Sequence, residues 1–215
     1  MKKIFLTLFV MLFASGVMAS ETPNLSANDA LLKLKQGNEH FVQMHLKHPN
    51  QTKLRRDSLI KSQHPFAVVL TCSDSRVPAE IIFDQGLGDI FVIRNAGNVL
   101  DEHVIGSLEY AVEHIGTNLI VVMGHESCGA VGATMSDAKG SEYIESIKKS
   151  IQPAIAQAKK ENNATAEGVS KDNAKLGVCD ALKLSEVLQE AAKERGLKII
   201  PAYYHLDTGK VEFLN

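Results

Sequence analysis

The sequence lacks several features that would assign it to a functional class at once. Its charges nearly balance, with 23 Lys and Arg against 25 Asp and Glu and a formal net charge of −2. Nucleic-acid-binding domains need a clustered basic surface, so this balance argues against nucleic acid as a partner. Beyond the first twenty residues, no segment is long and apolar enough to cross a bilayer. There is also no internal repeat, no low-complexity tract and no tryptophan.

Residues 1–19 have the composition of a cleaved secretory signal. Two lysines precede an apolar run, and small residues lead to a cleavage site after Ala19. A membrane helix is the alternative, but the run is shorter than the roughly 20 apolar residues that span a bilayer. We therefore expect export to the periplasm, no membrane association after cleavage, and a single domain over residues 20–215.

Cysteine is scarce, with only Cys72, Cys128 and Cys179 in the chain. An odd and small set is unlike the disulfide framework of a secreted domain. Unpaired thiols in an oxidising compartment are open to oxidation unless something occupies them, and a bound metal would do so. Cys179 lies in a helical pattern and is interpreted as a packed core thiol.

Three short apolar runs, residues 66–71, 90–94 and 119–124, are typical of strands buried on both faces. Residues 101–116, between the second and third runs, have apolar positions at helical spacing. Strand, helix and strand in this order predict an α/β fold with a mainly parallel central β-sheet flanked by helices.

The remaining segments extend this fold. Ser26 is a candidate N-cap for an amphipathic helix that must dock on its own domain or on a second copy. Helices are also predicted over residues 142–160 and 173–195, with residues 161–172 as a mobile linker. The tail ends in two β-like runs joined by a turn at 207–210, which predicts a hairpin at the sheet edge.

Three metal-ligating side chains follow two of the predicted strands. Cys72 ends the first strand, while His125 and Cys128 stand three apart just after the third. A lone buried Cys is more often a small core residue, and a lone His more often a hydrogen-bonded one, but all three at neighbouring strand ends favour a metal site. Two thiolates and an imidazole suit zinc, and three protein ligands with an open position are typical of a catalytic site.

Asp74 and Arg76 alternate with Cys72 in the stretch "TCSDSRVPAE". Extended backbone directs residues two apart to the same side. We expect Arg76 to hold Asp74 through a bidentate charge-assisted pair and to leave the fourth metal position open. The alternative is a surface ion pair of little energetic consequence.

The motifs "CSDSRVP" and "GHESCGA", with "GDIFVIRNAGN" and "SLEYAV" between them, resemble those of the β-class carbonic anhydrases. The resemblance runs from about Leu31 to the C-terminus. It implies zinc binding by Cys72, His125 and Cys128, a catalytic dyad of Asp74 and Arg76, and reversible hydration of carbon dioxide by zinc-bound hydroxide. It also implies N-terminal helices packed on a partner subunit, in a homodimer or homotetramer.

Carbon dioxide is small and apolar, so its pocket needs hydrophobic walls. Backbone N–H groups near Gly129, where a helix begins, are candidates to bind the developing bicarbonate anion. The residues do not identify the group that carries the proton away.

Two positions depart from the family pattern. "GNEHF" has His40 where many members have arginine, and we interpret His40 as a substitution on a helix face or an interface. Members with a regulatory bicarbonate site carry a tryptophan three residues before the first ligand cysteine, where this chain has Val69. The chain therefore resembles the subgroup without that site.

Two other functions fit the same motifs. Relatives of this kind hydrolyse carbonyl sulfide or carbon disulfide by the same attack, and access to the pocket would decide between these substrates. The second is a non-catalytic zinc-stabilised scaffold, although a structural zinc site ordinarily has a fourth Cys or His ligand.

Overall fold

A five-stranded sheet forms the centre of the protein in the computed structural model, which describes residues 25–136 and 138–215. The predicted signal sequence therefore lies outside the described residues. The strand order is β2-β1-β3-β4-β5, and only β5 is antiparallel to its neighbour. The strands are β1 (Ala67–Cys72), β2 (Ile90–Asn95), β3 (Leu119–His125), β4 (Lys198–Tyr204) and β5 (Val211–Phe213). The predicted parallel sheet and edge hairpin are confirmed.

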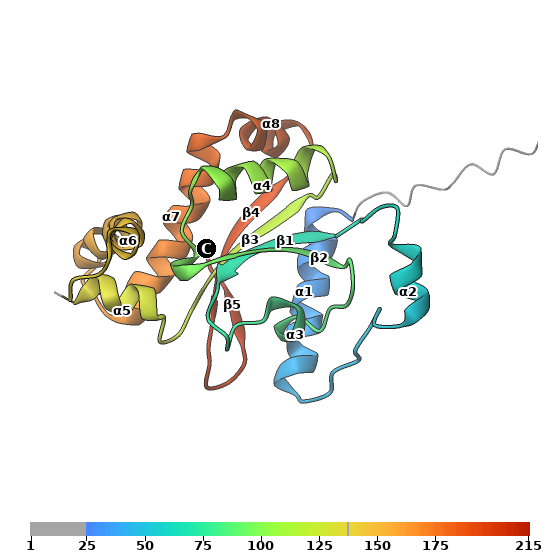
Figure 1. Ribbon diagram of the computed structural model, residues 1–215, viewed down its shortest axis with the longest axis horizontal. Coiled ribbons are helices and arrows are strands. Elements are labelled where there is room, and N and C mark those ends of the chain that lie inside the picture. The colour runs from blue at the N-terminus through green and yellow to red at the C-terminus, as the bar shows by residue number, and fades with distance from the viewer. Residues whose placement is uncertain (1–24, 137) are drawn as a thin grey trace, which may run out of the picture.

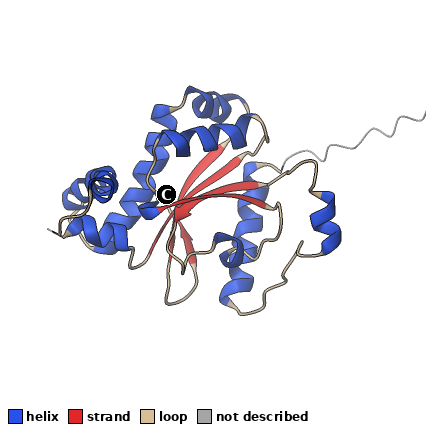
Figure 2. Ribbon diagram, in the orientation of Figure 1, coloured by secondary structure: helices blue, strands red, loops and turns tan. Residues whose placement is uncertain are grey.

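Helices cover both faces of this sheet (Figures 1 and 2). One face carries α1 (Ala27–Val42) and α3 (Ala79–Ile82), and the other carries α4 (Glu102–Glu113), α7 (Ala166–Leu184) and α8 (Glu186–Glu194). A short α2 (Lys53–Ser58) follows α1 in the chain. Beside the carboxyl ends of the strands lie the 3-10 turn η1 (Ala96–Asn98), α5 (Gly129–Met135) and α6 (Glu142–Lys160).

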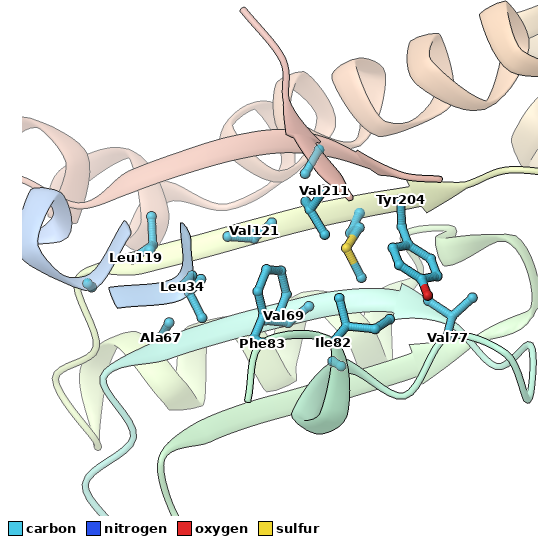
Figure 3. Packing of buried hydrophobic residues seen from close by; sticks show 14 of the residues in the cluster. Leu34, Ala67, Val69, Val77, Ile82, Phe83, Leu119, Val121, Tyr204 and Val211 are labelled. Carbon is cyan, nitrogen blue, oxygen red and sulfur yellow. The ribbon is translucent and has the colours of Figure 1, made fainter. Parts of the chain in front are cut away.

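The central strand β1 shows why the sheet needs two helical layers. All six of its residues are buried, and successive side chains point to opposite faces. Val69 packs with Leu34 of α1 and with Phe83 after α3, as Figure 3 shows. Val68 and Leu70 instead join the cluster under α4, α7 and α8. The continuous apolar run is therefore the sequence counterpart of burial on both sides.

Side-chain caps define where the helices begin. Ser26 Oγ accepts a hydrogen bond from Asp29 N at 3.2 Å, which confirms the predicted N-cap of α1. Thr165 caps α7 in the same way, through Gly168 N at 3.0 Å. More than half of the predicted linker is therefore helix, because Thr165 caps a helix that includes residues 166–172.

Two further expectations for this region are wrong. The helix predicted over 173–195 is broken at Ser185, whose Oγ caps α8 through Leu188 N at 3.1 Å and also binds Glu109 at 2.6 Å. Cys179 is exposed rather than packed. The buried positions of α7 near it are Gly177 and Ala181, which face the sheet, and Cys179 lies on the opposite side of the helix.

Within the described part of the chain, none of the helices combines the length and the apolar character needed to cross a membrane.

Candidate metal centre

The three predicted metal ligands lie together at the carboxyl ends of two neighbouring strands. Cys72 is the last residue of β1, His125 is the last residue of β3, and Cys128 immediately precedes α5. Their ligand atoms lie within 4.8 Å of one another, and all three residues are buried. The chain passes from β1 to β2 on one side and returns to β3 on the other, so the cluster sits at the switch in strand order where open α/β sheets place their sites.

The two ring nitrogens of His125 have different surroundings. Its Nδ1 lies 2.8 Å from the backbone oxygen of Glu126, which makes Nδ1 the protonated nitrogen. Its Nε2 is buried and has no hydrogen-bond partner among the described residues. A buried nitrogen lone pair beside two thiols is costly unless a ligand takes it, so the residues fit a zinc ion with Cys72, His125 and Cys128 as its protein ligands.

The surroundings of the two thiols favour a thiolate. The pKa of Cys72 is lowered to about 4, chiefly because the Cys128 thiol donates a hydrogen bond to it, while burial acts in the opposite direction. The Gly97 N–H, 3.3 Å from Sγ, lowers it further. The pKa of Cys128 is raised, first by sharing its proton with Cys72 and then by burial. Two thiols that share one proton are prepared to bind a cation, which displaces it.

Asp74 and Arg76 form the predicted pair beside this cluster. Arg76 Nε and Nη2 donate to Asp74 Oδ1 and Oδ2 at 2.9 and 2.7 Å, and Arg76 Nη2 also reaches the Ser127 oxygen at 3.3 Å. These hydrogen bonds hold the pKa of Asp74 well below its usual range, although partial burial opposes them. Asp74 Oδ2 lies 4.0 Å from Nε2 of His125. The carboxylate is therefore ionised and directed at the ligand cluster.

Three residues that sequence reasoning did not identify donate side-chain hydrogen bonds to the backbone around the ligand cluster. Arg94 donates to the backbone oxygens of Cys72 and Asp74 at 3.0 and 2.7 Å. From α7, Ser170 donates to the His125 oxygen at 3.2 Å, and Asn173 donates to the Gly97 oxygen at 2.9 Å. Ser170 and Asn173 lie one turn apart on α7, a spacing visible in the sequence, but nothing there indicates that they face a backbone carbonyl.

Gly129 and His40, the remaining positions considered in the sequence, are not among the three clustered residues. Gly129 is the first residue of α5, and the backbone N–H groups of Val131 and Ala130 that follow it point to Cys128 Sγ and act to lower its pKa. His40 lies on α1, where Nδ1 is 3.1 Å from Oδ2 of the buried Asp84.

Comparison with known proteins decides the family. A family model described as carbonic anhydrase matches residues 67–211, from β1 to the start of β5. The chain belongs to the β-class carbonic anhydrases. It is 40% identical over 194 residues to a carbonic anhydrase of Mycolicibacterium smegmatis, covering 88% of this chain and 94% of that one. It is 38% identical to carbonic anhydrase 2 of Mycobacterium tuberculosis, covering 87% and 93%.

The solved structures of β-carbonic anhydrases share the fold. A β-carbonic anhydrase of Aspergillus fumigatus superposes with a TM-score of 0.67 at 28% identity, covering 87% of this chain and 90% of that one. One of two enzymes from Sordaria macrospora, described as tetrameric, gives a TM-score of 0.70 at 24% identity over 87% and 98% of the two chains. The fold of this chain, a mainly parallel sheet flanked by helices, is thus that of the β-carbonic anhydrases.

Proposed function

We propose that this enzyme hydrates carbon dioxide reversibly to bicarbonate and a proton, with zinc held by Cys72, His125 and Cys128. The observation that carries the proposal is the buried cluster of two thiols and an imidazole whose Nε2 has no partner among the described residues. Zinc in such a site lowers the pKa of water towards neutrality and so supplies hydroxide at working pH.

Residues around the three ligands would orient the nucleophile and line the pocket for carbon dioxide. Asp74, ionised and 4.0 Å from Nε2 of His125, can accept a hydrogen bond from a water or hydroxide beside the ligands and so orient its lone pair. Arg76 occupies both carboxylate oxygens and disfavours Asp74 as a fourth ligand. Val99 and Val131, buried beside the two cysteines, provide apolar walls suited to carbon dioxide. Backbone N–H groups at Gly129 remain our candidates for binding bicarbonate.

A purely structural zinc site is the competitor from outside enzyme chemistry, and the ligand set argues against it. Structural zinc ordinarily has four Cys or His ligands. In residues 25–136 and 138–215, the cluster contains no fourth residue of these types. An open fourth position, with a fixed carboxylate beside it, suits catalysis.

The test is stopped-flow carbon dioxide hydration on purified protein whose zinc content has been measured. We expect about one zinc per chain and hydration activity in the wild type, and the loss of both in Cys72→Ser. Cys179→Ser makes the same chemical change at an exposed thiol outside the cluster and should keep both. Zinc-loaded wild type without hydration activity from pH 7 to 9 would refute the proposal.

We further propose a homodimer or homotetramer. Large apolar side chains are exposed along the N-terminal third of the chain: Leu32, Val42, Met44, Leu54 and Ile60. Such a surface supports a contact with a second copy. Light scattering coupled to size exclusion measures the mass directly, and a monomer at micromolar concentration would contradict this expectation.

Export through a cleaved signal at residues 1–19 is also part of the proposal. Cell fractionation and N-terminal sequencing of the mature protein would test it, with periplasmic protein that begins near Ser20 as the expected result.

A further inference from the structure

Glu126 lies between the ligand His125 and the turn that joins β4 to β5, and the proposed reaction assigns it no role. It is half-buried, and it contacts the His125 ring and the β4–β5 turn through different atoms. Its backbone oxygen faces the imidazole, and its carboxylate faces the turn.

The backbone oxygen of Glu126 selects the tautomer of His125. It lies 2.8 Å from Nδ1. A hydrogen bond from Nδ1–H leaves Nε2 with a free lone pair, and it fixes the ring's rotation. This carbonyl therefore determines which ring nitrogen of His125 carries the proton and how the ring is oriented.

That carbonyl is held in place by the rest of Glu126. The backbone N–H donates to the Tyr204 oxygen at 2.9 Å. The Oε2 atom accepts from the N–H groups of Leu206 and Asp207 at 2.8 and 3.2 Å. The next residue, Ser127, has a φ of 52°, a left-handed conformation that a serine adopts only when its surroundings impose it. The ligand loop thus depends on the β4–β5 turn for its conformation.

We infer that Glu126 is a positioning residue for the metal centre: its carboxylate, clamped on the β4–β5 turn, fixes the carbonyl that orients His125. The inference rests on the proposed zinc site, and it extends the site to a turn far along the chain. Outer-shell partners of histidine ligands typically change metal affinity or activity by about 10- to 100-fold.

The experiment measures the zinc dissociation constant by competition with a chromophoric chelator. We expect Glu126→Ala to weaken zinc binding by about 10- to 100-fold. Glu126→Gln keeps an acceptor oxygen for the turn and should recover most of the affinity. Glu145→Ala is the matched control, because Glu145 Oε1 also accepts from a loop N–H, that of Gly140 at 2.8 Å, but it belongs to α6 and touches no ligand residue.

A merely structural role predicts a different pattern. Thermal unfolding of the metal-free proteins then shows a loss of stability in Glu126→Ala, with the zinc dissociation constant unchanged, and this result would overturn the inference. Equal weakening by Glu145→Ala would overturn it as well. The inference and the proposed function fail separately: a wild type that binds zinc but hydrates no carbon dioxide refutes only the function, whereas wild-type zinc affinity in Glu126→Ala refutes only the role of Glu126.

Discussion

Replacing Asp74 with asparagine isolates the part of the site that is specific to catalysis. Arg76 donates to Asp74 Oδ1 from its backbone N and from Nε, both at 2.9 Å, and to Oδ2 from Nη2 at 2.7 Å. An asparagine side chain offers one acceptor oxygen and one NH2 group. Whichever way the amide is turned, an N–H of Arg76 then faces another donor.

The size of the effect follows from these contacts. A hydrogen bond to a charged group contributes about 1.5–3 kcal/mol. The Arg76 side chain is 51% exposed, so solvent screening favours the lower value. Because about 1.4 kcal/mol corresponds to a factor of ten in rate, misorientation alone predicts about a tenfold loss. Loss of the charged oxygen that accepts a hydrogen bond from the nucleophile extends the expected fall in kcat/KM to about 100-fold.

The assay is stopped-flow hydration at matched zinc occupancy, because the variant must be compared with metal bound. Asp57→Asn, which removes a surface carboxylate paired with Lys53 at 2.6 Å, is the control and should leave kcat/KM unchanged. Full activity in zinc-loaded Asp74→Asn would refute the proposed role of the pair. Loss of zinc on this substitution would instead make Asp74 a ligand, against our expectation.

Four further outcomes can be checked. Hydration should accelerate towards alkaline pH, because two thiolates would leave little positive charge at the metal to acidify water. A hydration rate that does not change between pH 6 and pH 9 would contradict this. Burial raises the pKa of Asp84, but hydrogen bonds from the backbone of Lys47 and His48 and from His40 outweigh it and leave the pKa lowered. Its contribution is therefore present above the unfolded pKa near 4 and lost as pH falls through the folded value, so Asp84→Asn should cost about 1.5–3 kcal/mol in urea unfolding at pH 7 and progressively less as the pH falls below about 4. Gly124→Ala should cost about 1–3 kcal/mol, because its Cβ would lie 2.7 Å from Ser170 Oγ. At Gly106 an added Cβ would have no atom within 4 Å apart from its chain neighbours and the nearby backbone of α4, so Gly106→Ala should stabilise α4 by about 0.5–1 kcal/mol, and a loss of stability would show a contact at that exposed position.

Local patterns account for what could be predicted about the fold. The strands β1 and β3 are continuous apolar runs because each packs on helices at both faces, so burial leaves a direct trace in composition. The run in β2 also predicted a strand, but β2 lies at the sheet edge and is only partly buried. The helix α6 begins and ends at the predicted residues, since Ser141 caps it and the apolar spacing is regular. By contrast, α7 carries Ser170, Asp172 and Asn173 at buried positions, which hides its amphipathic character and made its first turns resemble a linker.

The sequence by itself was enough to predict the proposed ligand set, and it also predicted the partner of Asp74. Cys72, Asp74 and Arg76 are close in the chain, but the predicted alternation of extended backbone is wrong for the last two, because β1 ends at Cys72 and a turn follows. In that turn Val77 N donates to the Asp74 oxygen and Arg76 N donates to Asp74 Oδ1, both at 2.9 Å, so local turn geometry brings the pair together. His125 and Cys128 are equally local, and the family motifs name all five residues.

Only the tertiary structure decided how the ligands are supported. It placed the ends of β1 and β3 side by side. It also brought Ser170 to the backbone oxygen of His125 and Asn173 to the backbone oxygen of Gly97 in η1. It also placed the carboxylate of Glu126 on the turn after β4. Hydrogen bonds from side chains to distant backbone groups leave no periodic pattern in a sequence, because any segment can supply the carbonyl or N–H. The chemistry of the centre was therefore local in the chain, whereas its rigidity depends on how the chain folds.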